Sequence, residues 1–164
     1  MAHFAELDSQ NIVKRVIVIS DENCKIDDVE NEDAGINYCK SLYGSNTVWK
    51  QTKQGGFRHI HAGVGYSYNS DDDVFIKPSP YASWILNSNH EWEPPVRFDS
   101  SLGTAVESGI PFDQNEQFIA TTLGPNRRGI YIWDESVYQS DNTRGWVLID
   151  QTPAEADSVR PDDN

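Results

Sequence analysis

Two histidines and three consecutive aspartates are the side chains of this sequence best placed to do chemistry. His59 and His61 lie two residues apart, so a strand over this stretch would direct both rings to one face. Such a pair can supply two ligands to a metal ion, and the run 71–73 could add a third. No other histidine supports this spacing, and a calcium loop usually alternates its acids around a glycine. We therefore predict a plain turn at 71–73 and no metal site.

Two pairs of acids raise the question of glycoside hydrolysis, which uses two carboxyl groups. They are Glu91 with Glu93, and Asp134 with Glu135. Each pair lies in or beside a predicted hairpin turn, where acids are common. The sequence contains no nucleophile elbow, no phosphate loop and no dinucleotide fingerprint. We predict no catalytic residue, no cofactor and no enzymatic activity.

Cys24 and Cys39 are the two cysteines of the chain. Two thiols are too few for a metal site, and they do not form a Cys-x-x-Cys pair. Free thiols are the rule in a cytoplasmic protein, whereas an oxidising exterior would allow a disulfide between them. Closing that loop would stabilise the chain by roughly 3 kcal/mol. The sequence is compatible with both states.

The chain is strongly acidic, with 26 Asp and Glu against 13 Lys and Arg and a net charge of −13 over 164 residues. Phosphate binding needs clustered basic residues, so neither nucleic acid nor an anionic membrane is an expected partner. Seven acids fall within residues 21–33 and form either a solvated face or a patch for a basic partner. The sequence shows neither a signal peptide nor an apolar run of membrane-helix length, so we expect synthesis in a cytoplasm.

The elements that would position these residues are mostly strands. We expect strands over 4–7, 12–19, 48–52, 63–68, 74–76 and 117–122, and a strand or an extended segment over 57–62. The run 12–19 is apolar on both sides in its latter half, which predicts a central strand. Residues 31–42, which precede Gly44, have the apolar spacing of a helix. The predicted fold class is α+β and mostly β, with antiparallel hairpins forming a small sheet or sandwich and one helix over about 31–42.

One sequence phrase occurs twice. In it, aromatic residues are followed by a polar turn and then by a further tryptophan. It covers residues 81–95 and residues 129–149, with the second turn at 139–144, and each copy predicts a β-hairpin. The stretch between them is rich in Ser, Gly, Thr and Asn. The predicted organisation is a β-rich domain with one helix at 1–98, an irregular insertion with one strand at 99–128, a C-terminal Trp hairpin at 129–150 and an acidic tail at 151–164.

The aromatic side chains of these hairpins are the candidates for binding. Such rings fill a core, anchor a protein partner or stack on sugars. We favour core or interface, because the chain has few aliphatic residues to build a core without them. The residues that we assign to partner binding are Trp84, Trp92, Trp133, Trp146, Tyr66 and Tyr68.

Several phrases together resemble a family of small proteins encoded by tailed bacteriophages, notably those of marine cyanobacteria. They are Met1 to Asp8, Asn11 to Val18, Trp49 to Thr52, Gly63 to Tyr68, Pro80 to Leu86, Trp92 to Pro95 and Tyr131 to Glu135. The phrase at 84–95 is also similar to one in phage tail-fibre assembly and tail accessory proteins. The chain departs from the family at 99–128 and 139–144, because most members of the family are shorter in these two segments.

The resemblance implies a virion or its assembly, and it carries over no catalytic residue. We therefore expect a non-enzymatic structural component of a phage particle, at the tail, neck or capsid surface, made in the host cytoplasm. Its partners would be other phage structural proteins, and symmetric sites would take many copies. One alternative is a carbohydrate-binding module for host surface glycans, which would expose coplanar Trp or Tyr rings. Another is a tail-fibre assembly chaperone, which would be absent from finished particles.

Overall fold

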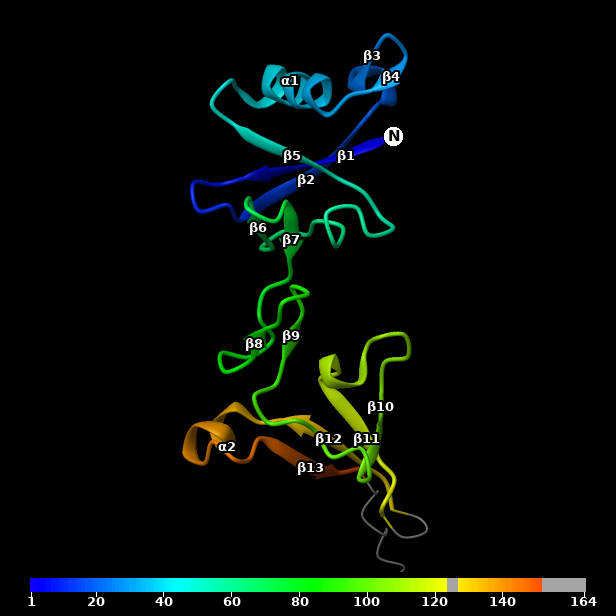
Figure 1. The fold of residues 1–164 in the computed structure, drawn as a ribbon, viewed down its shortest axis with the longest axis vertical. Coiled ribbons are helices and arrows are strands. Elements are labelled where there is room, and N and C mark those ends of the chain that lie inside the picture. Colours follow the sequence, from blue (N-terminus) through cyan, green and yellow to red (C-terminus); the bar gives the residue numbers. More distant parts are fainter. Residues whose placement is uncertain (124–126, 152–164) are drawn as a thin grey trace, which may run out of the picture. The chain divides into compact units, whose positions relative to one another are not determined.

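The computed structural model describes residues 1–123 and 127–151, so the tail predicted at 151–164 lies outside the described residues except for Gln151. The fold is α+β and mostly β, as predicted (Figure 1). The chain divides into two compact units, Met1–Pro78 and Ser79–Asn164, whereas the sequence suggested a first boundary at 98. The first Trp phrase thus belongs to the second unit, because Trp84 packs on Trp133 with ring centroids 6.3 Å apart.

A three-stranded antiparallel sheet forms the centre of the first unit. Its middle strand is β1 (Ala2–Leu7), which pairs with β2 (Val13–Ile19) on one side and β5 (Val48–Thr52) on the other. The prediction that 12–19 is the central strand was wrong. Five of the six residues of β1 are buried, whereas Val18 and two basic residues of β2 are exposed, so the shorter strand takes the middle position.

Helix α1 (Glu32–Tyr43) packs on one face of this sheet and confirms the helix predicted over about 31–42. The side chain of Asn31 caps it by accepting a hydrogen bond from the Ala34 N–H at 2.9 Å, and Gly44 ends it with a φ of 110°. Gly35 allows the helix to approach the sheet closely, since a Cβ there would lie 2.2 Å from the ring of Phe4. The core on this face consists of Ala2, Phe4, Ile19, Cys24, Cys39 and Trp49.

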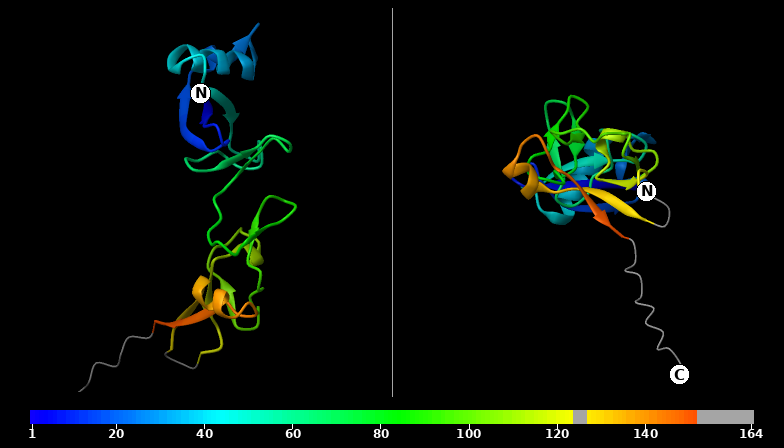
Figure 2. Two further views of the ribbon diagram at one scale, coloured as in Figure 1. Left: turned by 90° about the vertical axis from the view of Figure 1, so that its left-hand side faces the viewer. Right: turned by 90° about the horizontal axis from the view of Figure 1, so that it is seen from below.

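The other face of the sheet is covered by the hairpin of β6 (Ser67–Asn69) and β7 (Val74–Ile76), and by the segment that precedes it. Figures 1 and 2 show α1 and this hairpin on opposite sides of the sheet. The core on this face consists of Ala5, Leu7, Val13, Ala62, Tyr68 and Phe75. The strand predicted at 57–62 does not form, because Arg58 and His59 have left-handed φ angles of 54° and 70°.

The second unit is built around a four-stranded antiparallel sheet. Its strands lie side by side in the order β10 (Gly103–Ala105), β11 (Gln117–Ala120), β12 (Gly129–Trp133), β13 (Trp146–Asp150). The strand predicted at 117–122 forms as β11, but the prediction that it is the one strand of an irregular insertion at 99–128 was wrong. This stretch supplies two strands of the sheet, β10 and β11, and the 3₁₀-helix η2 (Phe112–Gln114).

Both Trp phrases form the predicted hairpins. The first consists of β8 (Ile85–Leu86) and β9 (Trp92–Glu93), and the second of β12 and β13. The turn predicted at 139–144 is only part of the second connection, which also contains the helix α2 (Glu135–Ser140). Asp134 caps α2 by accepting hydrogen bonds from two backbone N–H groups of its first turn. No helix of the described ranges is long and apolar enough to cross a membrane.

Candidate interaction surfaces

The histidines and aspartates singled out from the sequence do not come together as a metal site. His61 packs edge-on against His3, with ring centroids 5.2 Å apart, and its Nδ1 lies 3.3 Å from Thr52 Oγ1. His59 lies instead in a turn with left-handed backbone. The run 71–73 forms the turn between β6 and β7, as predicted. Within residues 1–123 and 127–151, no three His, Cys, Asp or Glu side chains are grouped as metal ligands would be.

The acids considered for glycoside hydrolysis each hold local structure. Glu91 and Glu93 accept side-chain amide hydrogen bonds at 2.6 and 2.8 Å. Asp134 caps α2, and Glu135 accepts a hydrogen bond from the Ser83 hydroxyl at 2.7 Å. This hydrogen bond is the main reason that the pKa of Glu135 lies below its usual value. Each of these carboxylates is thus engaged with neighbouring side chains or a helix end.

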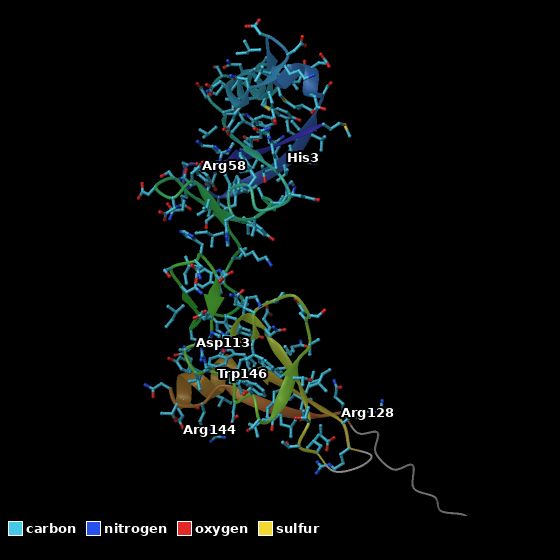
Figure 3. The ribbon with its side chains drawn as sticks, turned by 45° about the vertical axis from the view of Figure 1, so that its right-hand side comes forward. His3, Arg58, Asp113, Arg128, Arg144 and Trp146 are labelled. Carbon is cyan, nitrogen blue, oxygen red and sulfur yellow. The ribbon has the colours of Figure 1, made fainter. Side chains whose placement is uncertain are left out.

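Arg58 joins three elements of the first unit, although no sequence pattern singles it out. Its side chain is only 8% exposed. The guanidinium donates two hydrogen bonds to Glu32 of α1 at 2.7 and 2.9 Å, one to the Gln51 carbonyl of β5 at 2.8 Å, and one to Asp73 at 2.6 Å. The Tyr68 hydroxyl also donates to Asp73. We call these five residues the Arg58 network; Figure 3 labels Arg58.

The Arg58 network keeps its carboxylates charged. Burial is the largest single influence on Glu32 and Asp73 and disfavours their charged forms. The hydrogen bonds from Arg58, a further one from the Gln51 N–H to Glu32 or from Tyr68 to Asp73, and the positive charge of Arg58 together outweigh it and hold both pKa values below their usual range. Burial and the hydrogen bond to Asp73 raise the pKa of Tyr68 to about 12. Charges that are already paired with one another act as a brace between α1, β5 and the β6–β7 turn.

The six aromatic side chains assigned to partner binding do not form one exposed surface. Three are core residues, at 4, 2 and 6% exposure, which corrects their assignment as partner anchors: Trp84, Trp133 and Tyr68. The other three are half-buried: Trp92, Trp146 and Tyr66. Neighbouring rings meet at steep angles, 85° for Trp84 with Trp133 and 79° for Trp133 with Trp146. These rings therefore do not provide the coplanar platform on which a sugar would stack.

Aromatic residues instead cover one face of the four-stranded sheet. Phe98 stacks on Phe118 with centroids 3.9 Å apart and packs against Tyr131 and Trp146 at 5.1 and 5.3 Å. The indole N–H of Trp146 donates to the Val96 carbonyl at 2.8 Å, and Figure 3 shows this residue inside the unit. Directly paired residues of antiparallel strands share a face, and successive residues of a strand alternate between faces. The residues that alternate with Phe118, Tyr131 and Trp146 therefore lie on the opposite face of the sheet.

Apart from Thr104 and Gln117 at its edges, that opposite face is apolar, and no other helix or strand of the described chain lies on it (Figure 2). Ile119, Ile130 and Ile149 are paired in one row across β11, β12 and β13, and Ile132 and Val147 are paired in the next row. Ile119 and Ile149 are 50% and 42% exposed, and the other three are half-buried. The right-hand view of Figure 2 shows no helix or strand in front of β12 and β13. We call these five residues the open face.

Most acids of the stretch 21–33 are engaged within the first unit. Ion pairs join Asp21 to the N-terminal amine at 2.6 Å, Glu22 to Lys25 at 3.5 Å and Glu30 to Lys53 at 2.6 Å. The fourth engaged acid, Glu32, belongs to the Arg58 network. Only part of the stretch is thus available to a partner.

The part of this stretch that projects into solvent is a hairpin of two short strands, β3 (Lys25–Ile26) and β4 (Val29–Glu30). Its turn residues, Asp27 and Asp28, have left-handed φ angles of 51° and 61°, the geometry of a tight two-residue turn. Ile26 and Val29 flank this turn and are 53% and 68% exposed. The hairpin presents two acids and two aliphatic side chains together.

Cys24 and Cys39 are free thiols of the same core cluster, so the disulfide considered from the sequence is not formed. Cys24 ends the 3₁₀-helix η1 (Asp21–Cys24), and Cys39 lies on α1. Burial raises the pKa of Cys39 to about 11 and also raises that of Cys24. Both sulfurs are therefore protonated and unreactive in the folded unit.

No protein-family model matches this chain, and no curated protein or solved structure matches it significantly. The exposed surfaces of the two units are therefore the basis on which a function can be assigned. Of these, the open face is an apolar surface that three adjacent strands build together.

Proposed function

We propose that this protein is a non-enzymatic structural component of a bacteriophage particle that acts through protein–protein contacts. The proposal rests on one observation: β12 and β13 have apolar side chains on both faces of the sheet, but one of these faces is exposed. Both strands are apolar on alternate and intervening positions alike, Gly-Ile-Tyr-Ile-Trp and Trp-Val-Leu-Ile-Asp. Strands of this kind are typical of sheets covered on both faces, yet the described residues of the unit cover only the aromatic face.

The open face leaves hydrophobic stabilisation unrealised. Burying an isoleucine side chain fully contributes about 1.5–3 kcal/mol. Ile119 and Ile149 are about half exposed, so covering these two alone would contribute roughly 2 kcal/mol. The three half-buried side chains between them would add to this. An exposed apolar surface that is bounded by polar residues is typical of an interaction site.

The setting of a phage particle rests on the resemblance of several sequence phrases to small proteins of tailed phages. The hairpin β3–β4 adds a second exposed surface, on the other unit, where Ile26 and Val29 flank two acids. One chain could then contact two neighbours, as subunits of rings and larger symmetric assemblies do. The paired state of Glu91, Glu93, Asp134 and Glu135 is in keeping with a role that is not catalytic.

The test is mass spectrometry of gradient-purified particles beside infected-cell lysate, with copy number per particle. We expect the protein in particles at a fixed count that matches a symmetric site. We expect Ile149→Lys to be lost from particles, and Ile85→Lys, which changes a side chain 61% exposed on β8, to be retained. Detection in lysate alone would overturn the structural role and favour an assembly chaperone.

A further inference from the structure

We propose that the open face binds the open face of a second copy of this chain, so that two four-stranded sheets pack face to face. This inference rests on the proposed function, since it names the partner of the surface on which that function was argued. Each copy would then supply the layer that the other lacks. The product would be an intermolecular β-sandwich with a two-fold axis through the interface.

The shape of the open face favours another sheet as its occupant. All five side chains are isoleucine or valine, which are β-branched and stand stiffly on a pleated surface. Ile119, Ile130 and Ile149 form one continuous row over three strands, and the next row continues it over β12 and β13. Rows of this kind interdigitate with equivalent rows when sheets pack about 10 Å apart. In a two-fold interface the two surfaces are identical, so one set of residues supplies both of the matching rows.

Charge favours a second copy over a basic partner at this surface. The protein carries a net charge of −13, so most of its surface would repel another copy. The open face itself contains no charged side chain. Gln117, which is paired with Ile132 at its edge, is neutral. A basic partner would find no acid to pair with there, whereas a second copy would meet no like charge.

The borders of the open face carry charges of both signs. At one end Arg127 pairs with Asp150, the last residue of β13, at 2.9 Å. Arg144 lies beyond the other end of β13, and Figure 3 shows Arg128 and Arg144 far apart along this part of the unit. A border that holds both signs allows the same border of a second copy to approach. Charge on this unit therefore directs self-association to the open face and away from the acidic surface elsewhere.

The test is the oligomeric state of the purified full chain, measured by sedimentation equilibrium at several concentrations. We expect a dimer at micromolar concentration. The double variant Ile119→Lys/Ile149→Lys would bury four unpaired charges in the interface and should weaken the dimer by about 1000-fold or more. Ile85→Lys, at a side chain that is 61% exposed outside the open face, should leave the dimer unchanged.

A second variant covers the case in which lysine prevents folding. Ile119→Thr/Ile149→Thr keeps the β-branched shape of both side chains and removes apolar surface, so it should weaken the dimer by about 10-fold or more with an unchanged circular dichroism spectrum. A wild-type chain that stays monomeric at about 100 μM would overturn the inference. A dimer that both double variants form as well as the wild type would overturn it too.

The inference and the proposed function fail in different ways. A monomeric wild-type chain whose Ile149→Lys variant is lost from particles would mean that another virion protein covers the open face. In that case the inference is wrong and the proposed function stands. If the chain dimerises through the open face but is absent from purified particles, the inference stands and the proposed function is wrong.

Discussion

Replacing Arg58 by methionine should unfold the unit Met1–Pro78 at a markedly lower urea concentration. Methionine keeps a long unbranched stem and removes every N–H donor of the guanidinium. The variant leaves two carboxylates and a backbone carbonyl without the donors that now lie 2.6–2.9 Å away: Glu32, Asp73 and Gln51. Arg58 and methionine both carry a Cβ, so the left-handed backbone at this position costs the same in both proteins.

The expected loss follows from how deeply each partner is buried. Removing one member of a buried ion pair costs about 3–5 kcal/mol, because the other charge stays buried and unpaired. The side chains of Glu32 and Asp73 are 28% and 55% exposed, so water replaces part of what they lose. We therefore expect the low end, about 3 kcal/mol. If the free energy of unfolding falls by about 1.5 kcal/mol per molar urea, the urea concentration at the midpoint of unfolding falls by about 2 M.

The assay is hydrogen exchange followed by mass spectrometry across a urea series. Peptides from β1 and β5 report on the first unit, and peptides from β12 and β13 report on the second, so the shift should appear in the first set alone. Arg97→Met is the matched control, since it removes an arginine that is 77% exposed and paired with Asp113 at 2.5 Å. An exposed pair contributes at most about 1 kcal/mol. If β1 and β5 in Arg58→Met keep the wild-type midpoint within about 0.3 M, the network does not brace this unit.

Three further outcomes are expected. Acid should weaken the first unit through Glu32. Burial raises the pKa of Glu32, but hydrogen bonds from the Arg58 guanidinium and the Gln51 N–H, together with the positive charge of Arg58, hold it below its ordinary 4.5. Stability in urea titrations should therefore fall from about pH 4.5 downward, and less in Arg58→Met. Gly35→Ala would place a Cβ 2.2 Å from the ring of Phe4 and should destabilise the unit by about 1–3 kcal/mol, measured as a lower urea midpoint. Cys24 and Cys39 should react with a thiol reagent only on unfolding, because burial raises the pKa of both thiols, and spectrophotometric thiol counting measures this.

Each of these outcomes has a clear opposite. An acid curve that is the same in Arg58→Met as in the wild type would mean that the guanidinium does not lower the pKa of Glu32. A neutral Gly35→Ala variant would mean that α1 does not sit directly on Phe4. Asn37→Ala, at an exposed position of the same helix, is its control. Labelling of both thiols before unfolding would mean that the segment around η1 opens readily.

Most features that depend on neighbours in the sequence were predicted correctly. Helix α1 follows from the cap at Asn31, the apolar spacing and the stop at Gly44. The second Trp hairpin follows from two strands whose aromatic and β-branched residues pair across a polar connection. The short helix α2 was missed, because residues 135–140 contain the same polar residues that a turn would. Local pattern thus specified element types better than their exact connections.

Features that depend on distant parts of the chain could not be predicted in this way. β1 is central because β5, from a later part of the chain, pairs with the edge of β1 that β2 leaves free. Arg58 has partners at positions 32, 51 and 73, a combination that no local pattern indicates. The open face could likewise not be predicted, because the sequence of a strand that is apolar on both faces does not indicate whether another element covers both faces. Pairing register and exposure together were needed to find it.

The position of Gln51 on β5 has a consequence for how this protein behaves when crowded. Gln51 belongs to an edge strand, but its N–H donates to Glu32 at 2.8 Å and its carbonyl accepts from Arg58, so side chains occupy the place of a fourth strand. An unprotected edge is a template for cross-chain strand addition and fibril growth. Two charged side chains thus prevent a further strand from pairing with β5 at this position. Many copies of the chain could be held at high local concentration without joining through this edge.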